Sequence, residues 1–207
     1  LWRLTETLSW IWKGPSHRPV EKLRIAGAVY MLPDDQLYQL STAEFIIATA
    51  HLIGFHTSKN DAEAMDGLHK FLATIIRPKP TALQRLRSDP SGDPRQAFNS
   101  IVCEKRARNF EKVDIVTKVL IAQWFNNAAN RMLATAGLNA KSGEDAAPIT
   151  QGIFVQDWER QVVKVAEGGV YGNFDMVMQR AVMDVLSYID FKNDEIRKDI
   201  EARKQNN

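Results

Sequence analysis

Apolar residues recur at intervals of three and four along most of this chain of 207 residues, and this spacing constrains its fold more than any other feature. Residues three or four positions apart lie on the same face of an α-helix, so each run predicts a helix with one apolar stripe. The clearest run consists of Met65, Leu68, Leu72, Ile75 and Ile76. Because an apolar stripe is stable only when it is buried against another element, the pattern predicts helices packed around a shared core.

Residues that cap helices mark where the first two clear helices begin. Ser41, with Glu44 three residues later, has the pattern of a capping box and predicts a helix that Gly54 ends. Asn60 occupies the corresponding position before the second run. Pro78 ends that second helix, because proline lacks a backbone N–H and restricts the residue before it.

Four later helices are predicted from the same signals, and one of them carries Phe154, Trp158, Val162, Val165 and Ala166 and ends at Gly168-Gly169. After a polar connection at residues 77–93, Asp93-Pro94 has the pattern of an N-cap followed by the first helical residue. Asp114 starts a longer apolar run, and Asp175 caps the last one, which reaches Ile189. The side chains expected to face inward on the first two of these helices are Phe98, Ile101, Val102, Lys105, Ile115, Val119, Leu120, Trp124 and Phe125.

Together the runs predict an all-α fold, an irregular bundle of about six or seven helices. One stretch is ambiguous: residues 23–30 fit either a helical turn or a short strand, because periodicity cannot decide a run of this length. A single short β-hairpin near residues 23–32 therefore remains compatible with the pattern.

The chain divides by composition into four parts. Residues 1–138 form the N-terminal helical region, and residues 139–151 are small and polar with one proline, as expected for a linker. Residues 152–192 are predicted to form a helical hairpin that packs on the first region. Residues 193–207 form a charged tail, which we interpret as a solvated helix or a frayed end.

Composition limits the classes of protein to which this chain belongs. Hydrophobic residues make up 44% and charged residues 25%, which is average for globular domains, and the net charge of +2 gives no reason to expect a nucleic acid or an anionic membrane as partner. A single cysteine, Cys103, excludes an internal disulfide and fits an intracellular protein. No apolar run approaches the length of roughly 18–20 residues that crosses a bilayer. The chain begins at Leu1 without methionine, so we expect a fragment or a processed product.

No arrangement of residues in the sequence has the pattern of a reactive centre. The four histidines (His17, His51, His56 and His69) form no pair at the spacing of zinc ligands. Asp66 and His69 are three apart, but a bundle metal site would need a second such pair. The glycines at 168–172 follow a helix rather than a strand, so they indicate a turn and not a phosphate loop. We therefore expect no enzymatic activity, no metal and no cofactor.

One segment has an excess of basic residues and supplies an alternative reading as a nucleic-acid site. Its basic residues are Arg77, Lys79, Arg85, Arg87, Arg95, Lys105, Arg106 and Arg108. No aromatic residue is interleaved for base stacking, and an ordinary solvated helix face explains the pattern as well. We do not expect nucleic acid to be the main partner.

Three tryptophans, Trp2, Trp10 and Trp12, lie within a short segment at the start of the chain. Clustered aromatic residues near a terminus commonly anchor an interface, and tryptophan is enriched at binding hot spots. The alternative is that these side chains fold back onto the core of the same domain. Both interpretations fit the sequence.

A series of short motifs carries a resemblance to a known group of proteins. The motifs are LPD at 32–34, LSTAEF at 40–45, LATIIRP at 72–78, DPRQAF at 93–98, AQWFN at 122–126, WERQVVKVA at 158–166, GVYG at 169–172 and VLSYI at 185–189. In their order and spacing, the chain resembles small morphogenesis proteins of tailed phages and prophages, especially of Bacteroidetes-type hosts. These are encoded near the tape-measure gene and are regarded as tail assembly chaperone-like. The tryptophan-rich start lies outside the pattern.

The resemblance implies binding rather than chemistry. Proteins of this group resemble transient partners that cover an aggregation-prone tape-measure helix in the host cytoplasm until tube subunits replace them, and such a helix would dock in an apolar groove. We assign this groove to Phe45, Phe71, Trp124, Phe125 and Trp158. The partner is then the tape-measure or another tail protein, with self-association as an alternative. Two other functions remain open: a structural tail or neck component of the virion, and a nucleic-acid-binding regulator that uses the basic segment.

Overall fold

The structure, a computed structural model, describes residues 14–81, 93–136 and 151–205. Within these residues it contains seven α-helices, one 3₁₀ helix and a small antiparallel sheet, so the prediction of a helical fold with a short hairpin is confirmed. The strands are β1 (Lys22–Ile25), β2 (Ala28–Met31) and β3 (Arg77–Pro78). The helices are α3 (Thr42–Thr57), α4 (Asp61–Ile75), α6 (Ser100–Arg106), the 3₁₀ helix η1 (Ala107–Lys112), α7 (Ile115–Thr135), α8 (Gln151–Glu167), α9 (Phe174–Gln179) and α10 (Val182–Gln205).

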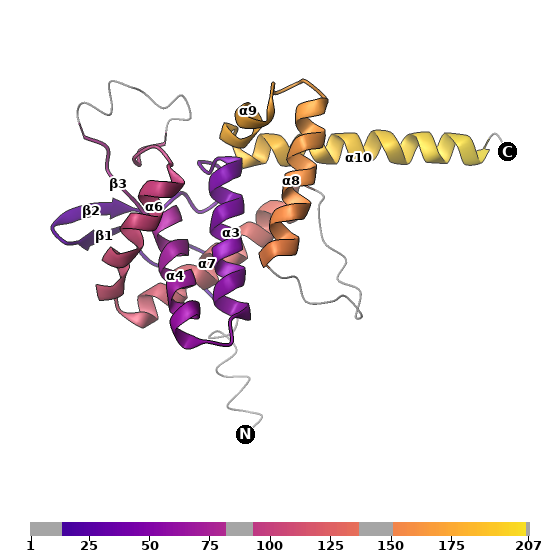
Figure 1. The fold of residues 1–207 in the computed structure, drawn as a ribbon. Coiled ribbons are helices and arrows are strands. Elements are labelled where there is room, and N and C mark those ends of the chain that lie inside the picture. Colours follow the sequence, from indigo (N-terminus) through magenta and orange to yellow (C-terminus); the bar gives the residue numbers. More distant parts are fainter. Residues whose placement is uncertain (1–13, 82–92, 137–150, 206–207) are drawn as a thin grey trace.

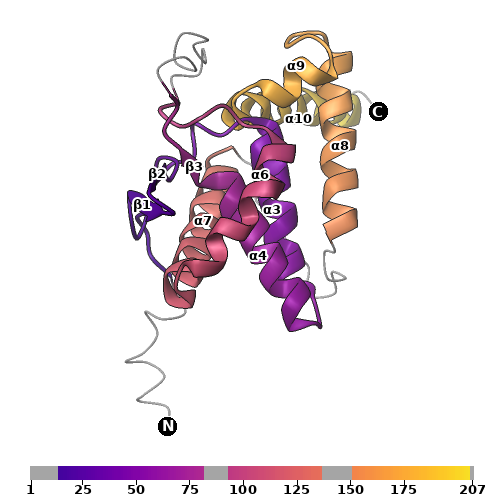
Figure 2. The same ribbon diagram turned by 60° about the vertical axis from the view of Figure 1, so that its left-hand side comes forward.

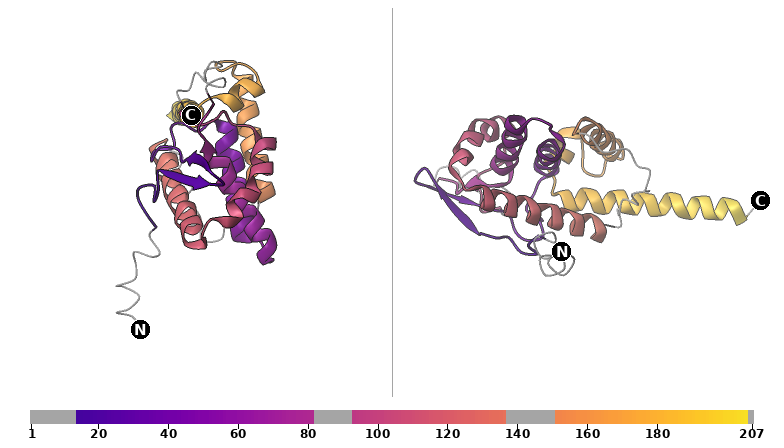
Figure 3. Two further views of the ribbon diagram at one scale, coloured as in Figure 1. Left: turned by 90° about the vertical axis from the view of Figure 1, so that its left-hand side faces the viewer. Right: turned by 90° about the horizontal axis from the view of Figure 1, so that it is seen from below.

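Helix α3 lies at the centre of the fold. Figure 2 shows it between α4 and α6 on one side and α8 on the other. In the right-hand view of Figure 3, α7 and α10 lie on one side of the row formed by α4, α3 and α8. The sequence of α3 is apolar around most of its circumference, as expected for a helix that other elements surround. The position of every other helix is therefore set by its contact with α3 or with the neighbours of α3.

The glycine that was expected to end α3 lies inside the helix, so this boundary was predicted wrongly. Helix α3 continues to Thr57, and Gly54 faces Gly67 on α4. A Cβ atom at Gly67 would lie 3.2 Å from the carbonyl oxygen of His51 and 3.2 Å from the backbone nitrogen of Phe55. The glycine therefore permits a close approach of the two helix backbones rather than a stop.

Both strands of the hairpin pack on the helices, β1 through Ile25 and β2 through Tyr30. Tyr30 on β2 packs edge-on against Phe110 of η1, with ring centroids 5.9 Å apart, and its hydroxyl accepts a hydrogen bond from Asn109 at 3.1 Å. On its other edge, β2 pairs with Arg77 and Pro78. The sequence analysis placed these two residues in a polar connection, so the third strand of the sheet was not predicted.

Four charged side chains form a buried cluster where α3, the end of α4 and the segment after residue 92 meet. Arg77 donates through Nη2 to Glu44 at 2.9 Å and to Asp93 at 2.6 Å. Arg95 donates to both oxygens of Asp93, and its Nη1 donates to Glu44 at 3.1 Å and to the carbonyl oxygen of Ile75 at 2.7 Å. All four charged residues are buried. Burial alone would lower the pKa of Arg95, but the carboxylates of Glu44 and Asp93 outweigh this effect and raise it.

This cluster explains two errors of the sequence analysis. Ser41 does cap α3, because its hydroxyl accepts from the backbone N–H of Glu44 at 3.2 Å, but the carboxylate of Glu44 pairs with the arginines instead of completing a capping box. Asp93 likewise does not cap a helix, because it binds Arg95. Helix α6 begins only after Asn99, whose side chain accepts from the N–H of Val102 at 3.0 Å.

The late start changes which side of α6 faces inward. The buried side chains are Cys103 and Arg106, whereas Ile101 and Val102, which were expected to face the core, are exposed. The prediction for Ile115 was also wrong, because this first residue of α7 is exposed.

The helix predicted from Asp175 to Ile189 is divided in two by a tertiary contact. The cap is Asn173, whose side chain accepts from Met176 N–H at 3.0 Å, and α9 ends at Gln179. The backbone at Arg180 is extended, and its carbonyl accepts from the N–H of Thr42 at 2.8 Å. This backbone pairing with the start of α3 takes the place of helical hydrogen bonds, and α10 begins immediately after it.

Helix α10 then continues to Gln205 and includes most of the stretch that the sequence analysis described as a charged tail. Figure 1 shows its second half extending away from the remaining helices. None of the helices that the structure describes is both long enough and apolar enough to cross a membrane.

We predict that replacing Glu44 by Gln destabilises the fold by about 3–5 kcal/mol, because it leaves two buried guanidinium groups with a single carboxylate between them. The free energy of unfolding, measured by urea denaturation, tests this. Glu63→Gln is the matched control: this glutamate is exposed and accepts only from the Ser58 hydroxyl, so a change within about 0.5 kcal/mol is expected. Equal effects of the two substitutions would contradict a central role for the cluster.

Candidate functional site

The aromatic residues proposed for partner binding come together in space, but most of them lie inside the core. The ring of Phe125 on α7 lies 5.1 Å from that of Phe71 on α4 and 6.3 Å from that of Phe45 on α3, measured between centroids. These three side chains and Trp124 are buried. In this arrangement a partner has no access to them, because helices α3, α4 and α7 cover their faces.

The fifth aromatic residue, Trp158, covers this cluster from outside. It belongs to α8 and is only partly buried, and its ring packs edge-on against Phe45 at a centroid distance of 5.6 Å. Val162 and Val165 continue the same stripe of α8 into a second, smaller core with Ile46 of α3. Helix α8 therefore seals one side of α3 and separates the aromatic core from solvent.

An open apolar groove lies directly beside this seal. We call it the α3 groove; it has a volume of about 330 Å³ and is lined by Ile46, Ile47, Ala50, His51, Lys70, Thr74, Ser100, Cys103, Glu104, Val155 and Met178. Its floor is the part of α3 that neither α6 nor α8 covers. Of the α3 residues that line it, Ile46 and Ala50 are each 5% exposed and Ile47 is half-buried, so the groove is a hollow beside α3 rather than an exposed face of it.

Charged and polar groups stand along one border of the α3 groove. Lys70 pairs with Asp66 at 2.7 Å, and Glu104 lies nearby on α6. Burial lowers the pKa of His51, and the neighbouring Lys70 lowers it further, so this imidazole is neutral at pH 7. Burial also raises the pKa of the Cys103 thiol, which disfavours the thiolate that a nucleophile would need. The groove therefore offers apolar contact and a polar edge rather than an activated group.

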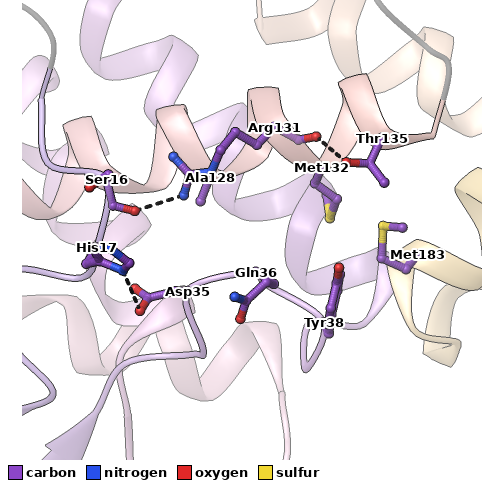
Figure 4. A pocket seen from close by; sticks show the side chains of 10 residues that line it. All are labelled: Ser16, His17, Asp35, Gln36, Tyr38, Ala128, Arg131, Met132, Thr135 and Met183. Atoms are coloured by element: carbon purple, nitrogen blue, oxygen red, sulfur yellow. Dashed lines mark hydrogen bonds and ion pairs between the residues drawn. The ribbon is translucent and has the colours of Figure 1, made fainter.

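A second hollow lies between α7, the start of α10 and the segments around Ser16 and Asp35. It has a volume of about 330 Å³ and an apolar floor of Ala128, Met132 and Met183 (Figure 4). Polar side chains form its rim, and Arg131 donates to the carbonyl oxygen of Ser16 at 3.0 Å.

The carboxylate of Asp35 ties the border of this hollow together. It accepts from the backbone N–H of Arg18 at 2.6 Å, from the indole of Trp124 at 3.2 Å, and lies 3.3 Å from Nδ1 of His17. Partial burial would raise the pKa of Asp35, but the Arg18 N–H and the His17 side chain outweigh this and lower it. With both oxygens engaged, Asp35 holds the segment around residue 17 against α7.

The basic segment does not form one continuous strip. Arg77, Arg95 and Arg106 are buried, and Arg106 donates to the side chain of Gln96 at 3.0 Å. Lys79, Lys105 and Arg108 are exposed. Arg85 and Arg87 lie outside the described residues. Three of the arginines therefore cannot reach a phosphate backbone in this structure.

Other expectations also fall outside the described residues. Trp2, Trp10 and Trp12 precede residue 14, and nearly all of the expected linker precedes α8. The spacing of Asp66 and His69 corresponds to two separate contacts, because Asp66 pairs with Lys70, whereas Nε2 of His69 lies 2.9 Å from the ammonium group of Lys118. In the described part of the chain, no group of three or more potential ligands is arranged to hold a metal ion.

Comparisons with protein-family models, with curated proteins and with solved structures find no match to this chain. The geometry of the site therefore has to be interpreted from its own residues.

The sequence analysis missed the residues that form the open groove. Met178 belongs to the apolar run predicted after Asp175, and Val155 was not singled out, although it is 38% exposed. The sequence did contain one signal for this groove: α3 is apolar around most of its circumference. Two neighbouring helices cannot cover such a helix completely. Which side of α3 faces the groove depends on where α6 and α8 pack, and residue spacing alone does not determine this.

We predict that Asp35→Asn lowers the free energy of unfolding at pH 7 by about 1 kcal/mol, the usual contribution of a hydrogen bond at a partly solvated site. Because the folded state lowers the pKa of Asp35, its stabilisation is present above the pKa of the unfolded chain, about 3.9, and is lost as the pH falls through the lower folded value. Unfolding curves measured between neutral and strongly acidic pH should therefore converge for the two proteins. Parallel curves would contradict the role assigned to Asp35.

Proposed function

We propose that this protein is a non-enzymatic binding protein that accepts an apolar segment of a partner in the α3 groove, and that it acts as a tail assembly chaperone for a phage tape-measure protein. The first part rests on the groove itself. The second rests on the resemblance of the motifs between residues 32 and 192 to phage morphogenesis proteins.

The observation that carries the proposal is an apolar groove beside the central helix, with the exposed side chain of Val155 at its wall. Grooves that bind amphipathic helices combine an apolar floor with a polar rim, and the side chains of the bound helix enter at three- and four-residue spacing. The α3 groove has such a floor in Ile46, Ile47 and Ala50, and Lys70 and Glu104 supply charges of both signs at its edge. Its volume of about 330 Å³ is near the lower end of the range of about 300–1,000 Å³ seen for small-ligand sites, which suits a few side chains.

The chemistry of the groove also favours a partner that can be displaced. A shallow contact without a buried ion pair gives a moderate affinity, and affinity differences among related complexes reside mainly in the dissociation rate. A chaperone needs this property, because tube subunits must replace it on the tape-measure helix. A nucleic-acid partner is less favoured, since Arg77, Arg95 and Arg106 are buried.

We predict that Val155→Asp weakens binding to a tape-measure fragment at least about tenfold, because it places a charge at the apolar wall of the groove. Co-expression with segments of a tape-measure protein, pull-down and titration of the purified pair measure the effect. Val163→Asp on the same helix is the matched control: Val163 is 41% exposed, compared with 38% for Val155, and lies outside the groove. The control should stay within about twofold of the unmodified chain.

Failure of every tape-measure segment to co-purify would contradict the chaperone function. If the protein is instead found in fixed copy number in purified virions, it is a structural tail or neck component. Mass spectrometry of finished particles distinguishes the two, because an assembly chaperone is absent from them.

A further inference from the structure

The second half of α10 is a helix without neighbours among the described residues. It passes beyond α8 and α9 and extends away from the remaining helices (Figures 1 and 3). Three large apolar side chains on this part are exposed: Phe191 (56%), Ile196 (56%) and Ile200 (48%). An isolated helix of this length is marginally stable in water, so contact with another surface would stabilise it.

The residues of α10 follow a heptad pattern that continues from the core into this free half. Val182 and Leu186 are buried in the main core. The same alternation of four and three residues then continues through the seam positions Ile189, Asn193, Ile196 and Ile200. Such a seam is the pattern with which two helices pack side by side. The seam is thus buried at Val182 and Leu186, partly buried at Ile189, which packs against the second core, and uncovered at Ile196 and Ile200.

We infer that the free half of α10 pairs with the same segment of a second copy of this chain, in antiparallel orientation. In this arrangement Ile189 lies opposite Ile200 of the second copy, and Asn193 lies opposite Ile196. The two-fold axis repeats each contact, so the surface is complementary to itself.

Charge decides the orientation and the register. Beside the seam, Asp190 lies opposite Arg197 of the second copy, and Lys192 lies opposite Asp199. The two-fold axis repeats each pair, so four flanking pairs form, each between an acidic and a basic side chain. A parallel pair would place Lys192 beside Arg197, and an antiparallel pair shifted by one heptad would oppose Arg197 to Arg197 and Asp199 to Asp199. Like charges at such flanking positions disfavour both alternatives.

The structure also sets the limits of the pairing. The next seam position after Ile200 is Arg203, and it would oppose Leu186, which is already buried in the core. The contact therefore extends from Ile189 to Ile200 and gives a weak, concentration-dependent dimer. Within each helix, Lys192 pairs with Glu195 at 2.7 Å and Arg197 with Asp194 at 2.8 Å. These pairs are exposed, so a change of partner costs little.

Sedimentation equilibrium of the full chain, from micromolar to millimolar concentration, tests the pairing through two matched variants. Ile196→Ser should weaken the dimer at least about tenfold, because it removes the apolar side chain from both central layers of the seam. Phe191→Ser removes a side chain of equal exposure from the opposite face of the same helix and should change dimerisation by no more than about twofold. A chain that remains monomeric at all concentrations, or one that responds equally to both substitutions, would overturn the inference.

Charge reversal tests the orientation by the recovery of dimerisation as well as by its loss. An acidic variant (Lys192→Glu with Arg197→Glu) and a basic variant (Asp190→Lys with Asp199→Lys) should each be monomeric, because every flanking pair then carries like charges. Mixing the two restores four attractive pairs and should restore the dimer as a one-to-one heterodimer. Circular dichroism of each variant checks that α10 is retained. Failure of the mixture to associate would contradict the proposed arrangement.

Discussion

The ion cluster of Glu44, Arg77, Asp93 and Arg95 is the interaction on which the rest of this structure depends. Two guanidinium groups and two carboxylates would be costly to bury singly, and here each charge has an opposite partner within hydrogen-bonding distance. The cluster joins the first turn of α3 to the residues after α4 and to the segment that leads into α6. It thereby fixes the side on which α6 passes α3, and this placement leaves the α3 groove open.

Helix α3 relates the core to the proposed binding surface. Its apolar residues face in most directions: α4 and α8 pack along two of its sides, and Phe125 of α7 contacts Phe45. Phe45 lies beneath Trp158 of α8, whereas Ile47 and Ala50 face the groove. Core and proposed binding surface are thus two sides of one helix, and the groove floor is part of a packed helix. A preorganised floor of this kind reduces the entropy lost when a partner binds.

In helix α10, too, a single apolar seam runs from the core into the proposed interface. Its seam begins in the core at Val182 and becomes exposed after Ile189 without a change of pattern. The contact of Arg180 with Thr42 sets where this helix starts, and so determines how much of it extends beyond the core. The proposed pairing of two copies and the proposed partner binding in the α3 groove involve separate surfaces, since none of the groove residues belongs to α10.

The sequence by itself determined the helical class and the caps Ser41, Asn60 and Asp114, because spacing and capping are local properties of the chain. It left residues 23–30 open between a helical turn and the strand that the structure shows. The sequence analysis misinterpreted Gly54 and Asp93. Gly54 does not end α3 but lies where α3 closely approaches α4, and Asp93 does not cap a helix but binds Arg77 and Arg95. Only the tertiary structure decided that Arg77, Arg95 and Arg106 are buried, and which side of α3 faces the groove. The physical reason is that burial and ion pairing arise between residues far apart in the chain, and their energies outweigh the small free-energy differences that local patterns reflect.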